Sequence, residues 1–153
     1  MNIGLGTKLR QLLAELDGDV QAVYEELDTP FRPRFYPIVR LLLEDKEASV
    51  GGIAEAIGVT QPAATQTINE MKRRGLLEVE SGPDRRSRTV RLTKDGRQLA
   101  DRLRPVWAAV HRAAADLDAD LPLGLEAILD AALSALRRRR FRARILKELG
   151  DTL

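Results

Sequence analysis

Amide, hydroxyl and cationic side chains recur on one face of a predicted helix between residues 61 and 73. They are Gln61, Thr65, Gln66, Asn69, Lys72 and Arg73. On the opposite face, Ala64, Ile68 and Met71 follow the i, i+4, i+7 spacing of a buried stripe. Amide side chains can pair with adenine, and a helix that is apolar behind and polar in front suits the reading of base edges in the DNA major groove.

The residues before this helix predict the partner that positions it. Ser49 begins a short helix whose apolar face holds Ile53, Ala54 and Ile57, and Gly58 ends it. Thr60 is a natural N-cap for the next helix, and Pro62 falls in the first turn, where a missing N–H costs little. We therefore expect a helix-turn-helix. A plain pair of packed helices without a nucleic-acid partner also fits this segment alone.

A charged β-hairpin is predicted immediately after the second helix. Gly75 suits the end of that helix, and the segments 77–80 and 89–92 alternate apolar and polar residues as half-buried strands do. The tip carries Arg85, Arg86 and Arg88. A hairpin that only protects a sheet edge can carry charges too, but it would more often mix their signs. The hairpin therefore favours a winged helix that contacts DNA.

Composition excludes several classes of function. The chain has 153 residues, a net charge of +2 and no cysteine, so disulfides, thiol sensing and cysteine-based zinc sites are excluded. His111 stands alone and is interpreted as a packed or half-exposed ring rather than a ligand. Residues 72–104 hold eleven Lys/Arg against five Asp/Glu, so the basic surplus lies where a phosphate backbone would sit. No metal or cofactor is predicted. The absence of a signal peptide or apolar span predicts a cytoplasmic protein without a membrane partner, and the composition suggests a bacterial source.

Apolar stripes continue on helices outside the winged core. One helix is predicted over about 20 residues from Leu5, another after its cap at Thr93, and a last long helix from residues 120–122 through Leu149. A small winged helix cannot cover three more stripes, so we expect a homodimer, as a palindromic site also requires. The basic run 137–147 is interpreted as a solvated helix face that pairs with acids of the N-terminal helix, with a second phosphate-contacting surface as the alternative.

Other function classes fit less well. A winged-helix protein-interaction or adaptor dimer without a DNA target remains the runner-up, and the arginine-rich tip argues against it. An enzyme is not expected, since no metal-ligand cluster, phosphate-cradling loop or activated nucleophile is evident.

The segment from Ser49 to Arg97 resembles the MarR family of dimeric bacterial winged-helix regulators. The resemblance rests on IAEAIGVTQPAATQTINEMKRRGLLE, on GPDRRSRTVRL and on LTKDGRQL. It implies that Asp84, in the family's Asp-x-Arg pattern, orients a basic side chain of the wing toward the minor groove. Many relatives carry arginine where this chain has Gln66, so an amide reading adenine is expected in place of an arginine-guanine contact. The resemblance also implies a possible small aromatic or acidic effector, which no group of residues here identifies.

The sequence therefore predicts a mainly α protein with a small β-hairpin wing. A single domain of residues 1–153 would hold a winged helix-turn-helix DNA-binding lobe at 30–93 and helical dimerisation regions at 1–29 and 94–153. The predicted function is a homodimeric, sequence-specific transcriptional regulator, a repressor, of a palindromic double-stranded DNA operator. The residues predicted to contact DNA are Ser49, Thr60, Gln61, Ala63, Thr65, Gln66, Asn69, Lys72, Arg73, Asp84, Arg85, Arg86 and Arg88.

Overall fold

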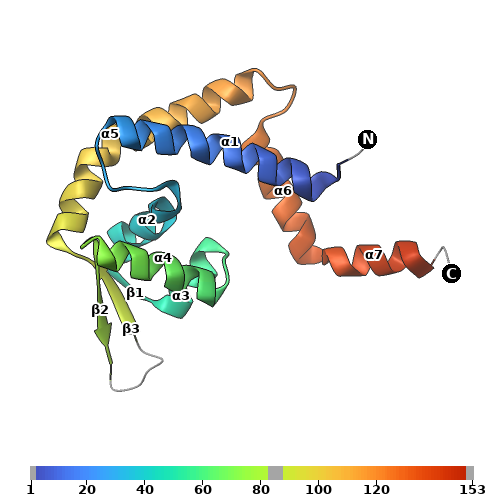
Figure 1. Cartoon of the computed structure of the whole chain (residues 1–153). Helices are drawn as coiled ribbons and strands as arrows, with labels where there is room; N and C mark the ends of the chain where they lie inside the picture. Colours follow the sequence, from blue (N-terminus) through green and yellow to red (C-terminus); the bar gives the residue numbers. More distant parts are fainter. Residues whose placement is uncertain (1–2, 83–87, 151–153) are drawn as a thin grey trace. The chain divides into compact units, whose positions relative to one another are not determined.

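The computed structural model describes residues 3–82 and 88–150 (Figure 1). The chain divides into two compact units, Met1–Arg104 and Pro105–Leu153. The described residues are mostly helical with one small antiparallel sheet, which confirms the predicted fold class. Within the described ranges, no helix is both long enough and apolar enough to cross a membrane.

The first unit contains the predicted helix-turn-helix and wing. In chain order its elements are α1 (Leu5–Glu26), a 3-10 turn η1 (Pro33–Phe35), α2 (Tyr36–Asp45), β1 (Glu47–Ser49), α3 (Val50–Ile57), α4 (Gln61–Arg73), β2 (Leu77–Ser81), β3 (Arg88–Leu92) and the start of α5 (Lys94–Ala119).

The sheet has three strands in the order β1-β3-β2, and both pairings are antiparallel. Val90 of β3 lies between Ala48 and Val79, and all three belong to the face that contains the buried side chains. The hairpin β2–β3 was predicted, whereas β1 was not. A strand of three residues is too short to show an alternating pattern, so the sequence carried no signal for it.

The core of the first unit lies between the helices and the inner face of the sheet. Its fully buried side chains include Phe35, Ile38, Leu42, Ile53, Ile68, Met71 and Val90. Three aromatic rings extend this core toward α1. Tyr24 meets Phe31 edge-on at 5.2 Å between ring centres, and Phe31 meets Phe35 in the same way at 5.7 Å. These rings fix the segment that leads from α1 into α2.

The helix α5 begins in contact with the base of the wing. The hydroxyl of Thr93 accepts a hydrogen bond from the N–H of Gly96 at 3.0 Å, which confirms Thr93 as the N-cap. The same hydroxyl donates to the carbonyl of Gly75 at 2.6 Å. One side chain therefore joins the end of α4 to the start of α5.

The second unit holds the rest of α5 and two further helices, α6 (Leu125–Arg138) and α7 (Phe141–Gly150). The prediction of one long final helix was wrong, because the backbone is extended at Arg139, with φ −143° and ψ 104°. The guanidinium of Arg144 donates to the carbonyl oxygens of Ala135 and Arg139, each at 3.4 Å, and the carbonyl of Ala135 also accepts from the N–H of Arg139 at 3.0 Å.

Large apolar side chains on the flanking helices are exposed in this chain. On α1 they are Leu5, Leu9, Leu13, Leu16 and Val23; on α6 and α7 they are Ile128, Leu129, Leu133, Leu136, Phe141, Ile145, Leu146 and Leu149. Phe141 is 60% exposed and Leu133 is 54% exposed. Faces of this extent on a single chain are typical of interaction surfaces.

Candidate nucleic-acid interface

The helix α4 is fixed at its N-terminus as the sequence predicted. The hydroxyl of Thr60 accepts a hydrogen bond from the N–H of Ala63 at 3.3 Å, and Pro62 lies in the first turn. Ser49 caps α3 in the same way, because its hydroxyl accepts from the N–H of Gly52 at 3.0 Å. Both hydroxyls therefore hold helix N-termini, and the positive end of the α4 dipole follows directly after the turn that joins α3 to α4.

The two faces of α4 differ sharply in exposure. Ala64, Ile68 and Met71 are at most 2% exposed and pack into the core. The other face borders a shallow, open depression of about 550 Å³, lined by Gln61, Pro62, Thr65, Gln66 and Asn69. The structure thus brings four of the predicted contact residues together on one surface.

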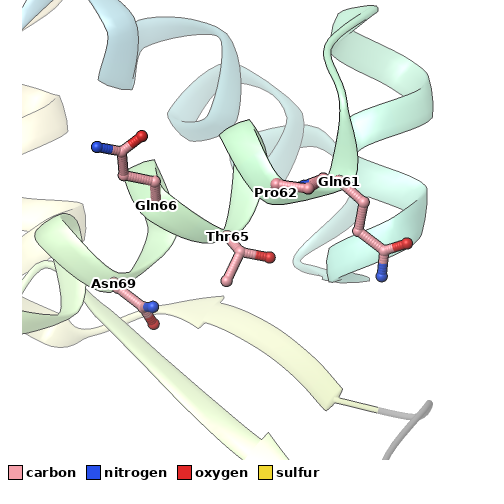
Figure 2. Close-up of a pocket in the computed structure, with 5 residues that line it drawn as sticks. All are labelled: Gln61, Pro62, Thr65, Gln66 and Asn69. Carbon is pink, nitrogen blue, oxygen red and sulfur yellow. The ribbon is translucent and has the colours of Figure 1, made fainter.

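Figure 2 shows how these side chains are directed. Gln61, Thr65 and Asn69, spaced four residues apart, project from one side of α4, whereas Gln66 projects in a different direction. The amides of Gln61, Gln66 and Asn69 make no hydrogen bond within the described ranges. Their donors and acceptors are therefore available to an external partner. The hydroxyl of Thr67, by contrast, donates to the carbonyl of Ala63 in the same helix at 3.2 Å.

Three further predicted contact residues lie along α4. Ala63 is exposed and offers only a methyl group. Lys72 and Arg73 are exposed in the last turn and form no ion pair with any residue that the structure describes. In the last turn, these positive charges also interact favourably with the negative end of the helix dipole.

The wing carries two kinds of arginine. Arg88 is exposed at the start of β3 and has no ion pair among the described residues, while Asp84, Arg85 and Arg86 lie outside them. Arg91, on the other face of β3, donates to Glu47 of β1 at 2.6 Å and to Glu80 of β2 at 2.9 Å. The hydrogen bond and charge of Glu47, followed by those of Glu80, raise the pKa of Arg91 above its ordinary value.

The sequence did not predict that Arg91 joins the three strands of the sheet. Its side chain bridges all three strands through two carboxylates that balance its charge, so Arg91 is less available to a polyanion than Arg88. The alternation in the hairpin placed Arg91 on the outer face, but the pairing with Glu47 required the strand β1.

Comparisons with known proteins agree on the family. The model of the MarR family matches residues 36–87. Similar solved structures include the MarR family transcriptional regulator SPO1453 from Silicibacter pomeroyi DSS-3, with 24% identity, coverage of 86% of this chain and 94% of that chain, and a TM-score of 0.64. BpsR from Bordetella bronchiseptica has 23% identity, coverage of 89% and 92%, and a TM-score of 0.64. A mutant MarR from E. coli, complexed with operator DNA, has 18% identity, coverage of 88% and 94%, and a TM-score of 0.67.

No curated protein matches the chain. Members of the MarR family are transcription factors rather than enzymes. Residues 36–87 of this chain thus match the model of the MarR family, and the chain shares the fold of solved MarR-family transcriptional regulators.

Proposed function

We propose that this protein is a homodimeric, sequence-specific DNA-binding transcriptional regulator that acts as a repressor in the bacterial cytoplasm. The observation that carries the proposal is the exposed polar face of α4, whose amides have no partner within the described residues while the opposite face is buried. A helix of this kind can enter the major groove and present its side chains to base edges.

In this proposal, Gln61 and Gln66 read adenine, since an amide can pair with both the N6 and N7 positions of that base. Thr65 and Asn69 lie beside them and offer further donors and acceptors, and the methyl group of Ala63 can contact thymine. These side chains would specify the sequence.

The phosphate backbone would be contacted from both sides of α4. Lys72, Arg73 and the capped helix N-termini at Ser49 and Thr60 fix the register. Arg85, Arg86 and Arg88 of the wing would lie at the adjacent minor groove, where their charges are attracted to the narrow, strongly negative groove of A·T-rich DNA. Asp84 would orient one of these arginines.

The dimer would be built by residues 1–29 and 94–153, and the DNA-binding lobe by residues 30–93. The exposed apolar faces of α1, α6 and α7 support this division, because a single chain leaves them in contact with water. A two-fold dimer presents two recognition helices, so the operator should be palindromic with half-sites about one helical turn apart.

Control by a small ligand is a further part of the proposal. It is supported by one similar structure, whose subject is the regulation of the DNA binding of BpsR by 6-hydroxynicotinic acid. Repression is supported by another, the transcriptional repressor CouR bound to a DNA duplex. Both statements concern those proteins, and gel shifts with this protein would test their extension to it.

A binding assay with matched variants tests the proposal. Gln61→Ala and Gln66→Ala should each weaken specific binding by about 1–3 kcal/mol, with much smaller effects on random DNA. The control is Gln11→Ala, which removes an exposed amide from α1 and should leave both affinities unchanged. Equal losses on operator and random DNA would show that these amides do not read bases. A protein that binds no DNA would instead favour the adaptor dimer.

A further inference from the structure

Three arginine side chains surround one largely buried glutamate in the last turns of α4. The side chain of Glu70 is 13% exposed, and its Oε1 lies 3.1 Å from Nε of Arg32 and 2.9 Å from Nη2 of Arg74. Its Oε2 accepts a hydrogen bond from Nη2 of Arg34. Among the residues that the structure describes, no other carboxylate pairs with these three arginines. The group therefore carries two positive charges in excess.

An aromatic platform holds the guanidinium groups in place. The guanidinium carbons of Arg34 and Arg74 lie 5.9 Å and 5.5 Å from the ring centre of Phe35, within the range of cation–π attraction. Phe35 is fully buried and is fixed by its edge-on contact with Phe31. Arg74 is held further, because its Nη1 donates to the carbonyl of Pro30 at 2.6 Å. Two of the three guanidinium groups thus have defined contacts besides Glu70.

Arg32 and Arg34 retain unused donors. Their side chains are 41% and 54% exposed, and beyond Glu70 neither forms a hydrogen bond or ion pair within the described ranges. The Nε of Arg32 is shielded from solvent and, although close to Glu70, makes no hydrogen bond of acceptable geometry. A guanidinium has five N–H donors, so most of those on these two side chains are open.

The electrostatics of the group favour a further anion. Burial, and then the positive charges of neighbouring arginines, lower the pKa of both Arg34 and Arg74. Their charged forms are therefore less stable than those of ordinary arginines, and one carboxylate does not compensate them. A second anion on the exposed side would relieve the repulsion without displacing Glu70.

We propose that Arg32 and Arg34, supported by Arg74, form a binding site for an oxyanion, a phosphate or carboxylate group, beside Glu70. Planar guanidinium groups can hold such an anion through two parallel hydrogen bonds each. Because Glu70 belongs to the recognition helix and the two arginines to the segment before α2, the bound anion would join these elements more firmly. The anion could be free in solution or a phosphate of bound DNA, and the latter source rests on the function proposed above.

Titration with inorganic phosphate tests the site without DNA, so failure of the DNA-binding proposal would not affect the result. Against sodium chloride at matched ionic strength, phosphate should bind saturably by calorimetry and raise the Tm of the wild-type protein. The double variant Arg32→Gln/Arg34→Gln should bind phosphate about tenfold more weakly or worse, because it loses charge-assisted hydrogen bonds. Arg40→Gln is the control, since Arg40 is similarly exposed but, among the residues that the structure describes, pairs with Glu44 alone, in the next turn of α2.

Glu70→Gln should change the affinity for phosphate in the opposite direction. It keeps the three cations and removes the competing carboxylate, so phosphate should bind more tightly than in the wild type. If the network had only a structural role, each variant would lose as much Tm in phosphate as it does in chloride.

The salt dependence of DNA binding distinguishes a phosphate of bound DNA from an anion that is free in solution. If a DNA phosphate occupies the site, the double variant should reduce the slope of log K against log salt by roughly one. If the anion is free, the slope should stay unchanged while the response to phosphate is lost. A wild-type protein that responds identically to phosphate and chloride, with an unchanged slope in the double variant, would overturn the proposal.

Discussion

Substitution of Gly96 tests how closely α5 packs on the base of the wing. A Cβ atom at this position would overlap the carbonyl oxygen of Leu76 and lie 3.1 Å from its carbonyl carbon. The same oxygen accepts a hydrogen bond from the N–H of Thr93 at 3.1 Å. Because the obstacle is backbone, no change of rotamer can relieve it, and Gly96→Ala must shift the start of α5 away from Leu76.

The expected cost follows from three contributions. Overpacking of a filled site typically costs about 1–3 kcal/mol, and weakening of the Thr93–Leu76 hydrogen bond adds up to about 1 kcal/mol. The higher helix propensity of alanine recovers up to about 1 kcal/mol. We therefore expect Gly96→Ala to lower the free energy of unfolding by on the order of 1–3 kcal/mol.

Gly51→Ala is the matched control, because Gly51 lies in the first turn of α3 and a Cβ there would meet no atom within 4 Å. This variant should gain up to about 0.5–1 kcal/mol. Urea denaturation followed by circular dichroism would compare both variants with the wild type. A Gly96→Ala protein as stable as the Gly51→Ala protein would refute the close packing of α5 against Leu76.

Three further predictions concern the wing and the dimer. Arg88→Ala should lower the slope of log K against log salt by roughly 0.9, the value for one phosphate, as measured by fluorescence anisotropy on operator DNA; an unchanged slope would place Arg88 away from the backbone. Asp84→Ala should weaken operator binding at moderate salt, although it removes an acid, because the wing arginine would lose its orientation; tighter binding would show that the wing acts only as a loose charge patch. Leu133→Glu on α6 should shift the protein toward monomer in light scattering, since the proposed interface buries roughly 2,000 Å² or more; a wild-type protein that is already a stable monomer at micromolar concentration would contradict the dimer.

The helix-turn-helix could be predicted because several local signals agree. The spacing of Ala64, Ile68 and Met71 gave the buried face, Thr60 gave the start of α4, and Gly75, with φ 73°, gave its end. Each of these signals acts within a few residues, so a linear reading of the sequence could find them.

Features that depend on distant residues could not be predicted in this way. Glu70 meets Arg34 across 36 positions of sequence, and the interaction of Arg91 with Glu47 spans 44 positions. Neither pairing has a local pattern, since the fold alone brings the partners together. The break between α6 and α7 was missed for another reason: Phe141 and Ile145 continue the apolar spacing of α6, although the backbone is extended at Arg139.

Selection of DNA fragments is the most direct test of the central claim. The purified protein would be mixed with fragments of the genome that encodes it, and the retained DNA would be sequenced. We predict recurrent enrichment of one palindromic sequence with half-sites about one helical turn apart. The enrichment should persist for Gln11→Ala and be lost for the double variant Gln61→Ala/Gln66→Ala. Fragments without a common sequence, or equal enrichment by the double variant, would contradict the reading of DNA by α4.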